Sequence, residues 1–189
     1  MLDLLYLLLG GVLWNNIILT QLLGLSPFLV ERKSSMEYVW GMGKMTTALM
    51  TASAFVTFLI YDVILEPLAL EFLENIILIL IVFLLVILFQ QYKKGEAREK
   101  RWHFYLPDVF MNTAVFGILL LNMTEWETVI EAIVGAAGFG LGFAVLLVII
   151  EAINSRVDKL PLPEWLRGIP IQLITLGILA LAVSGFSGI

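Results

Sequence analysis

The chain has 189 residues, of which 60% are hydrophobic and 14% charged, with a formal net charge of −5. A soluble domain carries roughly 25% charged residues, so this composition indicates a polytopic membrane protein with little mass outside the bilayer. A strongly basic face of the kind that binds nucleic acid is absent. The chain contains no cysteine, which excludes disulfides and thiolate-held metal centres built from this chain alone.

The amino-terminal residues predict a helix that stays in the protein. Met1-Leu2-Asp3 carries no basic residue, and no pattern of a cleavage site follows the first apolar run. A secretory signal peptide normally has both features. We therefore interpret the first run as a transmembrane helix.

Six uncharged runs predict six transmembrane helices, since a spanning helix needs about 20 residues. The third run is the clearest, because Ile76 to Phe89 contains only Ile, Leu, Val and Phe, and Tyr38–Lys44 extends the second run towards its amino-terminal side. The runs are Leu4–Val30, Met45–Tyr61, Asn75–Tyr92, Val109–Thr124, Ala132–Ile150 and Gly168–Ile189.

The first run contains a predicted break. Asn15 and Asn16 are adjacent amides inside it, and Gly24 and Pro27 follow. Lipid does not tolerate free backbone polar groups, so a broken helix at membrane depth must be buried in protein or line a cavity. Such breaks are typical of places where something binds or passes.

The fourth run carries a matching break. Asn112 and Gly117 are expected to interrupt it, and Pro107 precedes it. Interrupted first and fourth helices predict an inverted repeat of three plus three helices. The half-repeats cover about residues 1–92 and 104–189 of one membrane domain, joined by a basic loop at 93–103.

The charges predict the orientation of the helices. The loops after helices two and four contain acids and no base, and every basic residue falls in the other loops. By the positive-inside rule the basic loops are cytoplasmic, so both termini lie outside the inner (cytoplasmic) membrane. The basic residues are Arg32, Lys33, Lys44, Lys93, Lys94, Arg98, Lys100, Arg101, Arg156, Lys159 and Arg167.

Four polar residues are candidates for an ion path: Asn15, Asn16, Asn112 and Asp108. Uncompensated amides in lipid are costly, which favours a functional interpretation of the asparagines. Asp108 has two interpretations. It caps the amino-terminal end of helix four, which favours negative charge, or it attracts cations to the broken helix; the capping role is favoured.

Other features favour packing or the membrane interface over chemistry. Gly41-Met42-Gly43 and Gly138-Phe139-Gly140 echo one another, and small residues of this kind allow close helix packing. They form no phosphate loop. Ser26 has no base nearby in the sequence, and His103 is expected at the interface, where no second His could share a metal. We therefore expect no independent catalytic site and no metal site in this chain.

An ordered set of motifs along nearly the whole chain resembles a known family. The chain is similar to the RnfA/NqrE type of small membrane subunit of Rnf ferredoxin:NAD and Na⁺-translocating NADH:quinone oxidoreductases. The motifs are Asn15-Asn16, residues 23–28, Gly41-Met42-Gly43 with Thr46-Thr47, Leu106-Pro107, residues 112–115, Arg167-Gly168, residues 173–175 and residues 185–188.

The resemblance implies a role in electron transport. In that family the subunit pairs with a homologous sister of opposite topology, the RnfE/NqrD type, and each contributes two cysteines to a [2Fe–2S] cluster within the membrane. Electron transfer through the cluster is coupled to Na⁺ or H⁺ movement. The ligands stand in a Gly-x-Cys-Pro-Phe motif and an Asn-Cys-Ala motif.

This sequence departs from the family at both ligand positions. Ser26 stands at the first and Thr113 at the second. Neutral hydroxyls are poor iron ligands beside thiolates, so we expect this chain not to bind the cluster. Three accounts remain open: a divergent member without a cluster, a redesigned version of the scaffold, or a cluster held by the partner alone.

The favoured hypothesis is an integral membrane subunit of an ion-translocating complex of Rnf/Nqr type that transfers electrons across the membrane. The broken helices also fit a stand-alone transporter or channel on the same inverted repeat. A third hypothesis is a scaffold subunit with no transport of its own. We expect three kinds of partner: the RnfE/NqrD-type sister subunit, other membrane subunits of the complex, and the lipid bilayer.

Overall fold

A computed structural model describes residues 2–13, 16–21, 23–24, 36–94, 112–122, 125–157 and 159–187. Within these ranges the chain is helical and contains no strand, which confirms the all-α class. Three predicted site residues, Asn15, Ser26 and Asp108, lie outside the described residues.

The described ranges contain the following elements in chain order. They are α1 (Leu2–Val12), α2 (Ile17–Gln21), α4 (Met36–Ile60), a π-helix η1 (Tyr61–Leu65), a 3₁₀ turn η2 (Glu71–Leu73), α5 (Glu74–Lys94), α7 (Thr113–Asn122), α8 (Val129–Val157), a 3₁₀ turn η3 (Glu164–Leu166) and α9 (Ile169–Ser187).

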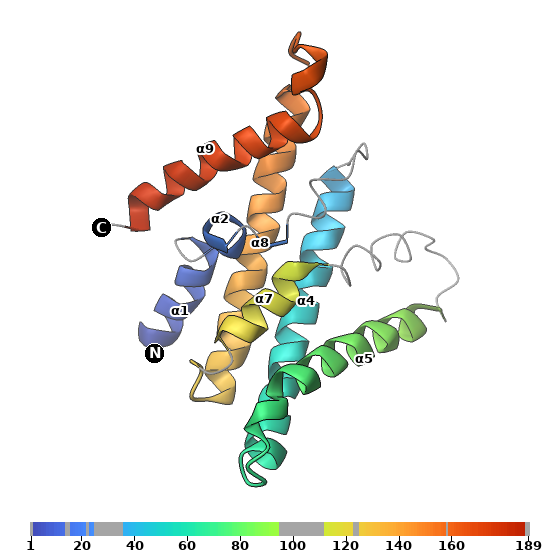
Figure 1. The fold of residues 1–189 in the computed structure, drawn as a ribbon, viewed down its shortest axis with the longest axis vertical. Helices are drawn as coiled ribbons and strands as arrows, with labels where there is room; N and C mark the ends of the chain where they lie inside the picture. The colour runs from blue at the N-terminus through green and yellow to red at the C-terminus, as the bar shows by residue number, and fades with distance from the viewer. Residues whose placement is uncertain are drawn as a thin grey trace.

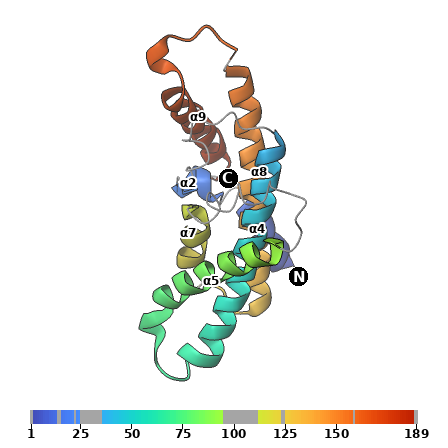
Figure 2. The ribbon, with the colours of Figure 1, turned by 90° about the vertical axis from the view of Figure 1, so that its right-hand side faces the viewer.

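The long helices α4 and α8 run side by side through the centre of the molecule (Figures 1 and 2). The short helix α1 lies along α8, while α5 and α9 start near opposite ends of the central pair and slant away from it to opposite sides (Figure 1). The buried apolar side chains come mainly from α4, α7 and α8, so the core surrounds the central pair.

Small residues bring α4 and α8 into close antiparallel contact. A Cβ placed on Gly43 would lie 2.7 Å from the Cβ of Ala144, and a Cβ on Gly140 would lie 2.7 Å from the Cα of Thr47. Side chains of ordinary size at these glycines would separate the helices. The packing interpretation of the two glycine motifs is therefore confirmed.

A second seam of small residues joins α1 to α8. A Cβ on Gly138 would lie 2.7 Å from the carbonyl oxygen of Leu8, and a Cβ on Gly142 would collide with the carbonyl oxygen of Gly11. The two glycines are four residues apart and share one face of α8. This small-xxx-small spacing is typical of helix pairs in membranes.

The described helices are consistent with a membrane protein. Two of them, Met36–Leu65 and Val129–Val157, are long and apolar enough to cross a bilayer, and shorter apolar helices occur in α1, α5 and α9. Large apolar side chains on α9 and α5 are exposed; Leu181, for example, is 74% exposed. Such helix surfaces fit contact with lipid or another apolar surface better than contact with water.

The helix bounds differ from the sequence prediction in two places. The prediction that Gly117 interrupts the fourth helix is wrong, because α7 continues through Gly117 to Asn122. A glycine costs an α-helix only about 1 kcal/mol, which packing of buried neighbours such as Ile118 offsets. The second helix begins at Met36, slightly before the predicted extension at Tyr38.

Candidate functional site

The first break lies between α1 and α2, as predicted. The α1 helix ends at Val12, and Asn16, only 3% exposed, begins the next helical segment. The Asn16 Oδ1 accepts a hydrogen bond from the Ile18 amide (3.2 Å), and the Asn16 carbonyl accepts from the Thr20 amide (2.9 Å). Asn16 therefore acts as the amino-terminal cap of α2.

The start of α7 has the same local construction as the start of α2. Asn112 is fully buried immediately before α7, and its Oδ1 accepts a hydrogen bond from the Ala114 amide at 3.0 Å. Its carbonyl accepts from the Val115 amide at 3.1 Å. A buried helix start must find acceptors for its first amides, and in both halves of the chain an asparagine supplies one.

The turn after α2 and the start of α7 meet in space. The Gly24 amide donates to the Thr113 Oγ1 at 2.8 Å, across 89 residues of chain. Gly24 has φ +81°, a conformation that side chains other than glycine rarely adopt. A Cβ on Gly24 would lie 2.9 Å from the Asn112 Oδ1 and 2.8 Å from the Phe143 Cε2. The turn after α2 thus rests directly on the start of α7 and on α8.

One buried polar atom at this junction, the Asn112 Nδ2, lacks a hydrogen-bond partner among the described residues. In contrast, the Asn16 Nδ2 reaches the Val12 carbonyl at 3.5 Å. An unpaired buried donor costs about 1–3 kcal/mol, so the Asn112 Nδ2 is the group at this junction that is free to donate a hydrogen bond to water.

We expect Thr113→Val to lower the free energy of unfolding by about 1–2 kcal/mol, because it leaves the buried Gly24 amide without its acceptor. Valine has nearly the shape of threonine, so packing is unchanged. Thr113→Ser keeps the hydroxyl and should restore most of the stability. Thermal unfolding in detergent checks this; equal stability of the valine and serine variants would contradict the role of the hydroxyl.

The residues present do not fit a thiolate-held iron–sulfur cluster. The chain has no cysteine, and the Thr113 hydroxyl already accepts the Gly24 amide. Within the described residues, no group of three or more His, Asp or Glu could hold a metal ion. Thr113 therefore has a structural role, because its hydroxyl joins the start of α7 to the turn after α2.

Comparison with known proteins decides the family. A family model described as "Rnf-Nqr subunit, membrane protein" matches residues 4–189. The chain belongs to the Rnf-Nqr family of membrane subunits. The resemblance noted in the motifs is thereby confirmed over nearly the whole chain.

The similar members of this family are subunits of redox complexes. The chain is 36% identical over 190 residues to a subunit of the ion-translocating oxidoreductase complex of Syntrophotalea carbinolica, covering 99% of this chain and 97% of the relative. It is 34% identical over 187 residues to a subunit of the Na⁺-translocating ferredoxin:NAD⁺ oxidoreductase complex of Acetobacterium woodii, covering 98% and 97%. A subunit of the ion-translocating oxidoreductase complex of Aliivibrio salmonicida is 35% identical over 191 residues, covering 100% and 98%.

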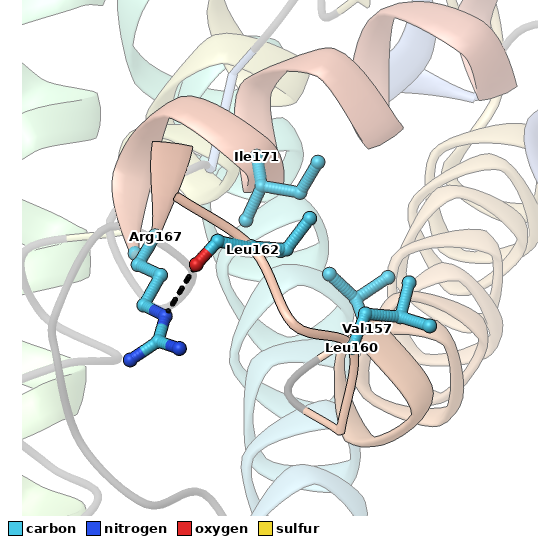
Figure 3. Close-up of a pocket in the computed structure, with 6 residues that line it drawn as sticks. Val157, Leu160, Leu162, Arg167 and Ile171 are labelled. Atoms are coloured by element: carbon cyan, nitrogen blue, oxygen red, sulfur yellow. Dashed lines mark hydrogen bonds between the residues drawn. The ribbon is translucent and has the colours of Figure 1, made fainter. Parts of the chain in front are cut away.

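Another motif of the resemblance, Arg167-Gly168, shapes the turn between α8 and α9. The Arg167 Nε donates to the Leu162 carbonyl at 3.0 Å (Figure 3), and Gly168 adopts φ +77°. Next to this bond lies a pocket of about 230 Å³, lined by Val157, Leu160, Leu162, Arg167, Gly168 and Ile171. In this family member the motif therefore reverses the chain direction before α9.

Proposed function

We propose that this chain is an integral membrane subunit of an ion-translocating electron transport complex of Rnf/Nqr type in the inner membrane. The observation that carries the proposal is the similarity over nearly its whole length to relatives named as subunits of such complexes. The buried junction of two broken helices gives the proposal a physical site, because broken helices at membrane depth commonly surround the path of an ion.

We infer that the chain forms six spans as an inverted three-plus-three repeat. Paired contacts support the repeat: Gly43 lies against Ala144 and Gly140 lies against Thr47. A shift of 97 residues takes Gly43 to Gly140 and Thr47 to Ala144, so a two-fold operation would exchange the two contacts. The matching caps at Asn16 and Asn112, 96 residues apart, support the same relation.

The proposed orientation gives a direct prediction, for which the cysteine-free chain is well suited. A single cysteine at Glu127 is expected to react in intact cells with a maleimide that cannot cross the inner membrane, because the positive-inside rule places that loop outside. A single cysteine at Lys159 should react only after the membrane is opened. Both residues are exposed, and the reverse labelling pattern would contradict the orientation.

The proposed partner is the homologous RnfE/NqrD-type sister subunit, with further subunits of the complex. Purification of the intact complex through a tag on this chain should recover the sister in equal amount. The relatives are themselves named as subunits of complexes, which supports a shared assembly. A chain that purifies without a sister would instead favour the stand-alone transporter, and ion flux into liposomes containing this chain alone would establish it.

We propose that the chain does not ligate a [2Fe–2S] cluster through Ser26 and Thr113. Iron–sulfur clusters are held by thiolates, with histidine as the occasional substitute, and neither position offers one. Loss of the cluster in a divergent member, redesign of the scaffold, and a cluster held by partner residues alone all agree with this arrangement.

Paired substitution tests the cluster proposal. In the purified complex, Ser26→Cys with Thr113→Cys is expected to raise the iron content and to add a [2Fe–2S] signal in the EPR spectrum, since thiolates replace hydroxyls at both positions. The single Thr113→Cys variant is the control and should add neither. A matching intramembrane [2Fe–2S] signal that depends on Ser26 and Thr113 in the unaltered complex would contradict the proposal.

A further inference from the structure

The buried face of α4 carries three hydroxyls that lack partners. Thr46, Ser53 and Thr57 are 0%, 0% and 2% exposed, and their hydroxyl oxygens have no hydrogen-bond partner among the described residues. Other hydroxyls of α4 do have partners within the helix. The neighbouring Thr47 and Thr51 each donate to the carbonyl four residues earlier, Gly43 and Thr47, at 2.8 Å.

The three hydroxyls form one stripe along the helix. They are spaced by seven and then four residues, which at 3.6 residues per turn places them within about 40° of one another. Along the axis they extend over about 16 Å, roughly half of the 30 Å hydrocarbon core. We refer to Thr46, Ser53 and Thr57 as the hydroxyl stripe.

One end of the hydroxyl stripe is linked through α8 to the junction between the breaks. The α7 helix, which begins at Thr113 directly after Asn112, packs against α4. Thr46 lies between Gly43 and Thr47, which contact α8 at Ala144 and Gly140. Phe143, the neighbour of Ala144, is itself close to Gly24 at the junction. Asn112, through Gly24, and Thr46, through its neighbours Gly43 and Thr47, are therefore both linked to the part of α8 around residues 140–144.

The other end leads to an acidic surface. Beyond Thr57, α4 changes into the π-helix Tyr61–Leu65, a distortion that often accompanies functional sites. The segment 61–74 contains Asp62, Glu66, Glu71 and Glu74 and no basic residue. A mouth of negative charge attracts cations and raises their local concentration.

The three hydroxyls of the stripe are buried without hydrogen-bond partners in the part of the chain that the structure describes, and such burial is normally avoided. A buried hydroxyl without a partner is destabilising, and three such groups lie on one face of α4. Water or an ion usually accounts for such groups. Oxygen donors are also the groups that replace the hydration shell of hard cations in pores.

We propose that Thr46, Ser53 and Thr57 line the route by which a monovalent cation crosses the membrane between Asn112 and the acidic segment 61–74, with their hydroxyl oxygens replacing part of its hydration shell. The inference rests on the proposed function, because it gives the ion of that complex a path through this chain. The hydroxyls bind the cation or its water during passage, and α4 supplies the route separately from any electron carrier.

The test is a set of shape-conserving variants in the intact complex, reconstituted into vesicles. Thr46→Val, Ser53→Ala and Thr57→Val combined should lower the number of ions moved per electron transferred by about tenfold, since hydrogen bonds to charged or ordered partners are lost. Thr51→Val, whose hydroxyl is already paired within the helix, is the matched control and should leave the ratio unchanged. The double variant Thr46→Ser with Thr57→Ser keeps all three hydroxyls, so its ratio of ions to electrons should equal that of the parent.

A second measurement separates transport from folding. The triple variant removes unpaired polar atoms and keeps side-chain shape, so its unfolding temperature should be equal to or higher than that of the parent. A triple variant that is stable and moves ions at the parental ratio would overturn the inference. If vesicles lacking the chain altogether still transport ions, the proposed function fails instead, which distinguishes the two outcomes.

Discussion

Gly24→Val is expected to lower the free energy of unfolding by about 2–6 kcal/mol, the largest single effect in this chain. Two costs combine. A β-branched residue at φ +81° carries a backbone strain of about 1–3 kcal/mol, and overpacking a filled site costs about 1–3 kcal/mol more. The new Cβ would lie 2.7 Å from the Ala114 Cβ and 2.8 Å from the Phe143 Cε2.

The matched control is Gly177→Val on α9. A Cβ at Gly177 meets no atom within 4 Å among the described residues, and α9 is a regular helix there. Its unfolding temperature in detergent should therefore stay close to that of the parent, while that of Gly24→Val falls sharply. Equal unfolding temperatures of the two variants would contradict the close packing of Gly24 against α7 and α8.

Asn16→Leu and Asn112→Leu together are expected to abolish ion transport by the complex and to destabilise the chain by about 1–2 kcal/mol per site. Leucine has a similar volume but no acceptor, so the amides of Ile18 and Ala114 lose their caps. In a site shielded from water, those amides have no alternative partner. The variant at Asn112 also removes the unpaired Nδ2.

Serine separates capping from transport. Asn16→Ser and Asn112→Ser retain an oxygen that can cap a helix about as well as asparagine, but they remove the amide donors. Both serine variants should therefore be more stable than the leucine variants. Ion transport measured in vesicles should recover in Asn16→Ser, because the Asn16 Nδ2 is already directed to the Val12 carbonyl. It should not recover in Asn112→Ser, which loses the unpaired Nδ2. Unchanged transport in both leucine variants would favour the scaffold hypothesis.

The sequence predicts the breaks but not how they are built. Adjacent polar amides in an uncharged run locate the first break correctly, since α1 ends at Val12 and α2 begins at Ile17. That Asn16 and Asn112 each cap the following helix was open to prediction, because asparagine is a preferred cap. The interpretation of these residues as ion-path candidates overlooked this role.

Contacts between distant parts of the chain could not be predicted in the same way. The bond between Gly24 and Thr113 depends on the relative placement of two halves, which no local pattern encodes. The hydroxyl stripe was also missed. Thr46, Ser53 and Thr57 have the period of any helix face, and only their burial without partners distinguishes them from Thr47 and Thr51.

The prediction at Gly117 failed because intrinsic propensity was weighed too heavily. Glycine in a helix is a weak penalty, and packing overrides it where the helix is surrounded by neighbours. Val115, Ile118 and Leu119 are all buried around Gly117. Within the described residues, α7 therefore runs without interruption from Thr113, directly after its cap Asn112, to Asn122.

We expect ion movement driven by electron transfer to require this chain. The most direct measurement is Na⁺ and H⁺ uptake into inverted membrane vesicles energised with the electron donor of the complex, with the chain deleted and then restored. We predict that uptake is lost without the chain and returns with it, while vesicles energised by an unrelated pump are unaffected. Full uptake in vesicles that lack the chain would contradict the account.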